Sequence, residues 1–241
     1  MSETAQPEIL SEQRDGVLWL TLNRPAKANA MNVSMMSALA DRISAAASDA
    51  TVRAVAITGS GTRVFSGGVD VRSPSPLPPK QHARQRSEQF FRLLNAGLDF
   101  AKPLVAAVNG VASGGGLMLA LSADRVVAAE HASVALPEID LGSPTYAGMA
   151  MVSHFAGGTV SADLALSGRR MSARDAYACG LIAELAPDDV LHERAQQAAL
   201  MLAEKPPGTF ALSKRWLNRP LIAALAQAQR ESEATRAAED R

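Results

Sequence analysis

Two glycine-rich stretches of the sequence offer bare backbone N–H groups at the ends of apolar segments. Residues 65–70 (FSGGVD) follow one apolar run, and residues 113–116 (SGGG) follow another. A helix that begins at a glycine run leaves its first N–H groups unpaired, and glycine lets a ligand approach them closely. Two such turns on neighbouring strands form an oxyanion hole, which stabilises a carbonyl that becomes an enolate. Each glycine run alone is equally consistent with a tight turn between a strand and a helix.

Strand and helix signals alternate along the chain in an order that would position these turns. Asp15-Gly16 predicts a hairpin, and an apolar stripe of helical spacing that begins after Asn32 connects one buried strand to the next. Four prolines between Arg72 and Lys80 predict an exposed loop. Strands are predicted at 17–22, 53–58, 102–108, 125–129 and 131–136, and helices at 32–47, 82–100, 172–179, 191–204 and from 221 onward. The predicted fold class is therefore α/β.

The composition argues against several classes of protein. The 241 residues have a formal net charge of +0 and are 47% hydrophobic, which disfavours a nucleic-acid-binding or polybasic membrane-binding surface. The single cysteine, Cys179, excludes an internal disulfide framework and a cysteine-rich zinc site, and it is predicted to lie at a buried helix end. The four histidines lack metal-ligand spacing. Neither a secretory signal nor a membrane span is predicted, so the expected location is the cytoplasm.

Taken together, the motifs resemble the crotonase superfamily, or enoyl-CoA hydratase/isomerase family, from about Gly16 to Arg219. Residues 23–32 are similar to the family's first coenzyme A loop, and residues 57–70 are similar to its first oxyanion turn. The rest of the family pattern is matched by residues 102–116, Ala123-Asp124, Pro137-Glu138, Gly142 and Leu166-Ser167-Gly168. The set is specific, whereas any one of these motifs alone is weak.

The resemblance implies a crotonase-like spiral of ββα repeats in residues 1–185, which holds an acyl-CoA site, and a helical C-terminal region in residues 186–241 for trimer formation and closure of the pocket. It also implies a homotrimer or a hexameric dimer of trimers, a coenzyme A thioester of fatty acid metabolism as substrate, and neither a metal nor a redox cofactor. The N–H groups of Val69 and Gly115 are implied to hold the thioester oxygen. The implied acyl-CoA contacts are Lys27, Ala28, Ala30, Ser66, Gly67, Arg72, Gly114 and Met118.

The sequence departs from the hydratase pattern at one of two acidic positions. Hydratases of this family use two glutamates to position water and move a proton, and the corresponding residues here are Met118 and Glu138. Methionine has no titratable group and is more typical of core packing. The resemblance to Δ3-Δ2 enoyl-CoA isomerases, which work with a single glutamate, implies that Glu138 removes a proton from C2 of a 3-enoyl-CoA and returns it at C4. Partial burial beside Ile139 and Leu141 is expected to bring the Glu138 pKa near the working pH.

Other functions stay open on the same residues, including a different thioester reaction such as decarboxylation or C–C bond cleavage. A weak hydratase would use Glu138 alone to position water, and a non-catalytic acyl-CoA-binding protein would keep the oxyanion hole without the chemistry. Tyr146, eight residues beyond Glu138, is a candidate second acid or hydrogen-bond donor. Asp140 is expected to be solvated after its turn, and Asp70 and Asp124 are interpreted as structural residues that hold loops.

The C-terminus is a second departure from the family pattern. Family chains usually continue with a further helix and a basic tail that close the acyl pocket, whereas this sequence ends at residues 238–241. We therefore expect either a shorter lid or a pocket that a neighbouring subunit completes.

Overall fold

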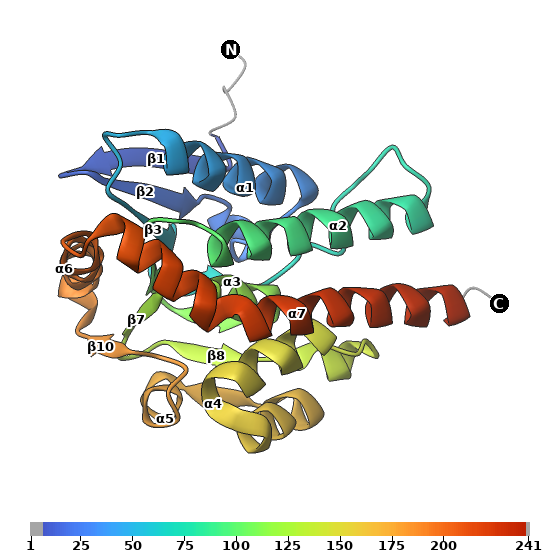
Figure 1. Cartoon of the computed structure of the whole chain (residues 1–241). Helices are drawn as coiled ribbons and strands as arrows, with labels where there is room; N and C mark the ends of the chain where they lie inside the picture. The colour runs from blue at the N-terminus through green and yellow to red at the C-terminus, as the bar shows by residue number, and fades with distance from the viewer. Residues whose placement is uncertain (1–6, 240–241) are drawn as a thin grey trace, which may run out of the picture.

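The structure, a computed structural model, describes residues 7–239 and contains two sheets flanked by helices (Figure 1). Residues 1–6 and 240–241 lie outside this range. The prediction that the N-terminus is not a signal peptide falls partly on residues 1–6. The strands are β1 (Ile9–Arg14), β2 (Val17–Leu22), β3 (Ala54–Gly59), β4 (Val64–Ser66), β5 (Leu104–Val108), β6 (Val111–Ser113), β7 (Arg125–Ala129), β8 (Ser133–Ala135), β9 (Arg170–Ser172) and β10 (Glu184–Ala186). The helices are α1 (Val33–Ser48), α2 (Pro79–Leu98), α3 (Gly115–Leu121), α4 (Tyr146–Ser167), α5 (Ala173–Ala178), α6 (Leu191–Ala203) and α7 (Pro207–Glu239), with the 3-10 helices η1 (Pro25–Lys27), η2 (Pro137–Leu141) and η3 (Asp188–Val190).

The larger sheet has the strand order β1-β2-β3-β5-β7-β10. It opens with the predicted hairpin, in which Asp15 and Gly16 have φ values of 49° and 81° and β1 pairs with β2 in the antiparallel direction. All later neighbours in this sheet are parallel. β3 and β5 are buried along their whole length, as is usual for parallel strands covered on both faces.

Successive turns of the chain add one strand to each sheet. The pairs β3 and β4, β5 and β6, and β7 and β8 each place their first strand in the larger sheet and their second in the smaller sheet, whose order is β4-β6-β8-β9. After the first two pairs, α2 and α3 return the chain to the larger sheet, whereas η2 and α4 follow the third pair and lead to β9 of the smaller sheet. This arrangement confirms the predicted α/β spiral of ββα repeats.

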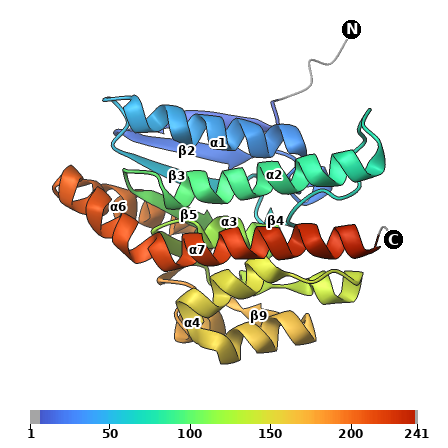
Figure 2. The ribbon, with the colours of Figure 1, turned by 45° about the vertical axis from the view of Figure 1, so that its right-hand side comes forward.

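The helices α1, α2 and α7 lie alongside one another (Figures 1 and 2). The Asn32 side chain caps α1 by accepting a hydrogen bond from Met35 N at 2.8 Å. The spacing of Leu39, Ile43 and Ala47 predicts that they share the buried face of this helix. Leu39 and Ile43 are buried, but the next buried position is Ala46, and Ala47 is exposed. The helical rotation of 100° per residue makes these two neighbours face different surroundings.

The C-terminal helix differs most from expectation. The sequence predicts a helix only from Leu221 onward, whereas α7 is one continuous helix that contains Pro220. Proline removes one N–H donor and disfavours the helix interior, which is why the pattern suggests a break. Lys214 and Asn218, on the two turns before the proline, are tied to other elements, and Asn218 donates to the carbonyl of Leu98 at 2.8 Å. Tertiary contacts therefore outweigh the local preference.

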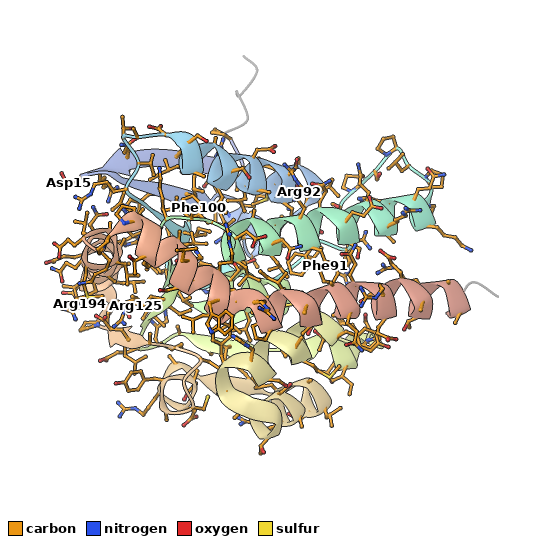
Figure 3. The ribbon with its side chains drawn as sticks, viewed as in Figure 1. Asp15, Phe91, Arg92, Phe100, Arg125 and Arg194 are labelled. Carbon is orange, nitrogen blue, oxygen red and sulfur yellow. The ribbon has the colours of Figure 1, made fainter. Side chains whose placement is uncertain are left out.

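A buried ion pair fixes α7 to the N-terminal ends of β5 and β7 in the larger sheet. Lys214 Nζ lies 2.8 Å from Asp124 Oδ2, and the same carboxylate oxygen accepts the N–H of Leu104 at 2.8 Å. Lys214 also lies 5.6 Å from the centre of the Phe100 ring, which is labelled in Figure 3. Asp124 thus joins a loop, a strand and a helix, in agreement with its interpretation as a structural residue.

Three further expectations concern the organisation of the chain. The division at residue 185 and the role of residues 186–241 in trimer formation stay predictions, although α6 packs directly on β3 and β5. Cys179 follows α5 and is half-buried, so the prediction of a buried position is wrong. Among the helices of residues 7–239, none is both long and apolar enough to cross a membrane.

Candidate active site

The two glycine turns lie side by side at the ends of neighbouring strands. β3 and β5 are parallel neighbours, and so are β4 and β6, which lead directly into the turns. A Cβ atom on Gly115 would lie 2.9 Å from Val69 Cγ2, and a Cβ atom on Gly68 would lie 3.1 Å from Gly115 N. Among residues 7–239, no acceptor is bonded to the N–H of Val69 or of Gly115. The turns therefore present two unpaired donors close together.

The shape of this donor pair depends on tight packing behind it. A Cβ atom on Gly116 would lie 2.3 Å from the backbone oxygen of Ser66, so only glycine lets α3 approach β4 this closely. The Ser66 hydroxyl is fully buried, donates to Asn29 O at 3.0 Å and accepts from Gly68 N at 3.2 Å. Its side chain thus shapes the turn, and the substrate contact expected for Ser66 stays a prediction.

Glu138 lies beside the donor pair. It sits in the first turn of η2, and its Oε1 atom would be 2.6 Å from a Cβ atom on Gly114, whose φ is +52°. Its Oε2 atom is buried and has no hydrogen-bond partner among the described residues. Burial raises the pKa of the Glu138 carboxyl above its usual value, and a backbone hydrogen bond opposes this to a smaller extent. A buried carboxyl with a raised pKa beside two unpaired N–H donors is a candidate group for proton transfer.

The cause of this burial differs from the sequence expectation. Ile139 and Leu141 were expected to cover Glu138, but their exposed fractions are 42% and 72%. The short 3-10 helix instead turns Glu138 inward against Gly114. Asp140 is exposed, as expected, and its carboxylate lies against Gly168, where a Cβ atom would meet Oδ2 at 2.6 Å.

A cavity of about 360 Å³ connects the donor pair with Glu138. The sequence-predicted residues that line it are Gly67, Val69, Gly114, Gly115, Met118, Glu138 and Tyr146. Met118 is 5% exposed and contributes a thioether to the wall. Phe90 of α2 also lines the cavity, and a Cβ atom on Gly115 would lie 3.2 Å from its ring. Figure 3 shows its neighbour Phe91 between α2 and α7.

The C-terminal half of α7 forms one wall of this cavity. The family resemblance implies a C-terminal region that closes the pocket, but it identifies none of the residues in this wall. Tyr146 lies at the start of α4, and its hydroxyl oxygen is 2.9 Å from Thr235 Oγ1. Ser232 and Arg236 of α7 and Arg86 of α2 are further lining residues. They are far from Glu138 in sequence and follow no motif, so only the paired course of α2 and α7 brings them to the site (Figure 2).

The expected coenzyme A loop, residues 23–32, is held against the first glycine turn. Gly67 N donates to Ala28 O at 2.8 Å, and Met31 N donates to Gly68 O at 2.8 Å. Lys27 and Ala28 are exposed and Ala30 is half-buried. These residues lie outside the cavity lining, so they are available to a ligand that extends from the cavity along the surface.

Asp70 and Arg72, at the end of the first glycine turn, differ in their surroundings. Arg24 lies 3.0 Å from Asp70 and donates to Ala30 O at 2.7 Å, so Asp70 ties the two loops together, in agreement with its interpretation as a structural residue. Arg72 is exposed and does not line the cavity. Within residues 7–239, no group of three His, Cys, Asp and Glu side chains is placed to hold a metal ion.

Comparison with known proteins gives a consistent result. The family model described as enoyl-CoA hydratase/isomerase matches residues 12–239. The chain is 35% identical over 239 residues to the 2,3-dehydroadipyl-CoA hydratase of Escherichia coli K12, covering 97% of this chain and 92% of that protein. It is 36% identical over 214 residues to the 1,2-epoxyphenylacetyl-CoA isomerase of the same organism, covering 87% and 81%.

Solved structures agree with these sequence relatives. A crystal structure of an enoyl-CoA hydratase from Mycobacterium avium subsp. paratuberculosis K-10 superposes with a TM-score of 0.85 at 27% identity, covering 96% of this chain and 89% of that one. An enoyl-CoA hydratase/isomerase from Xanthobacter autotrophicus Py2 gives a TM-score of 0.85 at 29% identity, covering 95% and 87%.

Proposed function

Because the chain belongs to the enoyl-CoA hydratase/isomerase family, we propose that it is a Δ3-Δ2 enoyl-CoA isomerase in which Glu138 moves the proton. The observation that carries this proposal is that Glu138 is the only carboxyl group among the described residues that line the cavity. The other position at which hydratases place a glutamate is Met118. The two Escherichia coli relatives carry different reaction names, a hydratase and an isomerase, so the choice rests on these cavity residues.

In the proposed reaction, the thioester oxygen accepts hydrogen bonds from the N–H groups of Val69 and Gly115. Glu138 removes a proton from C2 of a 3-enoyl-CoA, and the electron pair moves into the thioester, where the two donors stabilise the enolate oxygen. The same proton returns at C4 as the double bond moves to C2–C3, so the carboxyl ends the cycle ionised. The Tyr146 hydroxyl, placed 2.9 Å from Thr235, supplies a further hydrogen bond in the cavity.

The coenzyme A part of the substrate is proposed to follow the loops outside the cavity. Lys27, Ala28, Ala30 and Arg72 would contact it along the surface, while Gly67, Gly114 and Met118 contact the part nearest the thioester. The coenzyme A thioester is the only small molecule that this reaction requires, and no metal or redox cofactor takes part in any step.

Activity assays of the full chain test the proposal. With trans-3-hexenoyl-CoA we expect formation of the conjugated 2-enoyl thioester, followed by its ultraviolet absorbance, and only slow hydration of crotonyl-CoA. Rapid hydration without isomerisation would support the hydratase alternative. Binding of both thioesters without turnover would support a non-catalytic acyl-CoA-binding protein. In that case the substitution Met118→Glu would test whether a second carboxyl restores hydration.

The pH dependence of the isomerisation reports the state of Glu138. Because the base must be ionised, kcat/KM should fall as the pH drops through the Glu138 pKa of the free enzyme. Burial raises this pKa, so the fall should occur at a higher pH than for an exposed glutamate. A pH profile of kcat/KM measures its midpoint. An acid limb at or below the usual glutamate pKa would contradict the buried position of the carboxyl.

Assembly and location remain proposals as well. Three large apolar side chains on α7, Leu212, Trp216 and Leu217, have exposed fractions of 66%, 70% and 66%. Exposed apolar clusters of this kind mark interaction surfaces, which supports a homotrimer or a dimer of trimers. Sedimentation of the full chain measures the mass of the assembly. The proposed location is the cytoplasm.

A further inference from the structure

Two arginines line the cavity at the end where α2 and α7 meet. Arg86 lies in the N-terminal half of α2 and Arg236 in the C-terminal half of α7, and both side chains are half-buried. The two helices run in opposite directions alongside each other, which brings these halves together (Figure 1). Arg236 also donates to Ser87 Oγ at 3.3 Å. Two cations thus share one partly enclosed space.

Among the described residues, no carboxylate is bonded to Arg86. The negative charge of Asp70 acts on Arg86, but Asp70 is already paired with Arg24 at 3.0 Å. Burial and, to a smaller extent, repulsion by Arg236 lower the pKa of Arg86. A partly desolvated cation without a bonded counter-ion is costly, and an anionic ligand would remove that cost.

The remaining lining at this end is rich in hydroxyl groups. Besides Ser113, which lies next to the glycine run, five serine and threonine residues line the cavity, namely Ser87, Ser143, Thr145, Ser232 and Thr235. Ser87, Ser232 and Thr235 each have a hydrogen-bond partner within the protein. A purely aliphatic acyl chain would still leave the Arg86 guanidinium without an anionic partner. The end of the cavity therefore suits a polar, negatively charged group.

The arginines lie beyond the point where the thioester oxygen is proposed to bind. Phe90 packs against the Gly115 backbone, and Arg86 lies one helical turn earlier on the same face of α2, which is about 6 Å along the helix axis. An acyl group held at the donor pair by its thioester would reach the arginines with its far end.

We propose that Arg86 and Arg236 bind a carboxylate at the far end of the acyl group, so that the preferred substrates are coenzyme A thioesters of dicarboxylic acids. The inference rests on the proposed function, since it takes the acyl group to occupy this cavity. The planar guanidinium of arginine binds a carboxylate through two parallel hydrogen bonds, which are stronger than those between neutral groups. The same chemistry would also recognise the phosphates of coenzyme A, and the experiment separates these two sources.

Binding of two unreactive saturated thioesters tests the proposal independently of catalysis. Hexanedioyl-CoA and hexanoyl-CoA have the same number of acyl carbons and the same coenzyme A part, and only the first has a terminal carboxylate. We expect isothermal titration calorimetry at pH 7 to show about tenfold to hundredfold tighter binding of hexanedioyl-CoA to the full chain. Equal or weaker binding of hexanedioyl-CoA would overturn the proposal.

Variants identify which arginines are responsible. In Arg86→Gln and Arg236→Gln, the preference for hexanedioyl-CoA should fall to less than about threefold while hexanoyl-CoA binds as before. Arg86→Lys should keep part of the preference, because it keeps the charge but loses the planar fork. The matched control is Arg84→Gln, since Arg84 is exposed on the same helix and paired with Glu88 at 2.8 Å.

The outcomes also separate this inference from the proposed function. If the glutamine variants weaken both thioesters equally, the arginines bind the coenzyme A phosphates and the carboxylate proposal is wrong. If neither thioester binds to the unsubstituted protein, the proposed function fails, and this inference fails with it. If both bind with the expected preference but neither enoyl thioester is turned over, the carboxylate site stands and the isomerase proposal is wrong.

Discussion

Glu138→Gln should lower kcat/KM for isomerisation of trans-3-hexenoyl-CoA by about 10²–10⁴-fold. The amide has nearly the same shape as the carboxyl but cannot take the C2 proton. No other carboxyl among the described cavity residues can replace it. The conjugated product absorbs in the ultraviolet, so the initial rate measures the effect directly. Asp140→Asn is the matched control, because Asp140 lies two residues away and is exposed.

The stability of the same variant distinguishes loss of a base from loss of the fold. A carboxyl whose folded-state pKa is raised contributes stability below its unfolded pKa and loses it as the pH rises through the folded value. At pH 7, above the unfolded pKa, the raised pKa of Glu138 therefore lowers the stability of the protein relative to glutamine, which does not titrate. Thermal unfolding should give Glu138→Gln a Tm at least equal to that of the unsubstituted protein at pH 7, with the difference shrinking below pH ~4.5. An active variant, or one that loses activity together with Tm, would contradict the proposed role.

The central strands of the larger sheet were predictable because local patterns and tertiary requirements agree there, whereas the ββα repeat was implied by the family resemblance. The apolar runs that became β3 and β5 are buried over their whole length, and their spacing through a helix requires parallel pairing. The glycine triplet was equally informative, since Gly116 packs against backbone and admits no side chain. Predictions from sequence agree with the structure where the same residue type suits both the local backbone conformation and the packing of neighbouring residues.

The wall formed by α7 was not predictable in the same way. Pro220 predicts a break, and nothing local signals that Lys214 will find a buried partner 90 residues earlier in Asp124. Thr235 and Arg236 join the cavity only because α7 runs back along α2. The position of Glu138 followed from the family resemblance, but its burial depends on the 3-10 helix that turns it toward Gly114, which the pattern around Ile139 and Leu141 did not indicate.

The second large effect is expected at the donor pair itself. Gly68 has a φ of +99°, and a Cβ atom there would lie 2.9 Å from Ser113 O and 3.1 Å from Gly115 N. In Gly68→Ala the methyl group would therefore occupy space beside one of the two donors, and the turn would have to shift. Because loss of one donor of an oxyanion hole typically costs about 10²–10³-fold in kcat, we expect a fall of this size in the isomerisation rate.

Gly68→Ala also strains the backbone, and the resulting loss of stability must be measured separately from the loss of activity. An L side chain at such a φ value costs about 1–3 kcal/mol, which a lower Tm should reveal. Gly158→Ala is the matched control, because Gly158 has no atom within 4 Å of its Cβ position and no positive φ. Circular dichroism at the assay temperature establishes that Gly68→Ala is folded before its rate is compared. A folded Gly68→Ala enzyme with an unchanged kcat would show that the thioester oxygen does not bind between Val69 and Gly115.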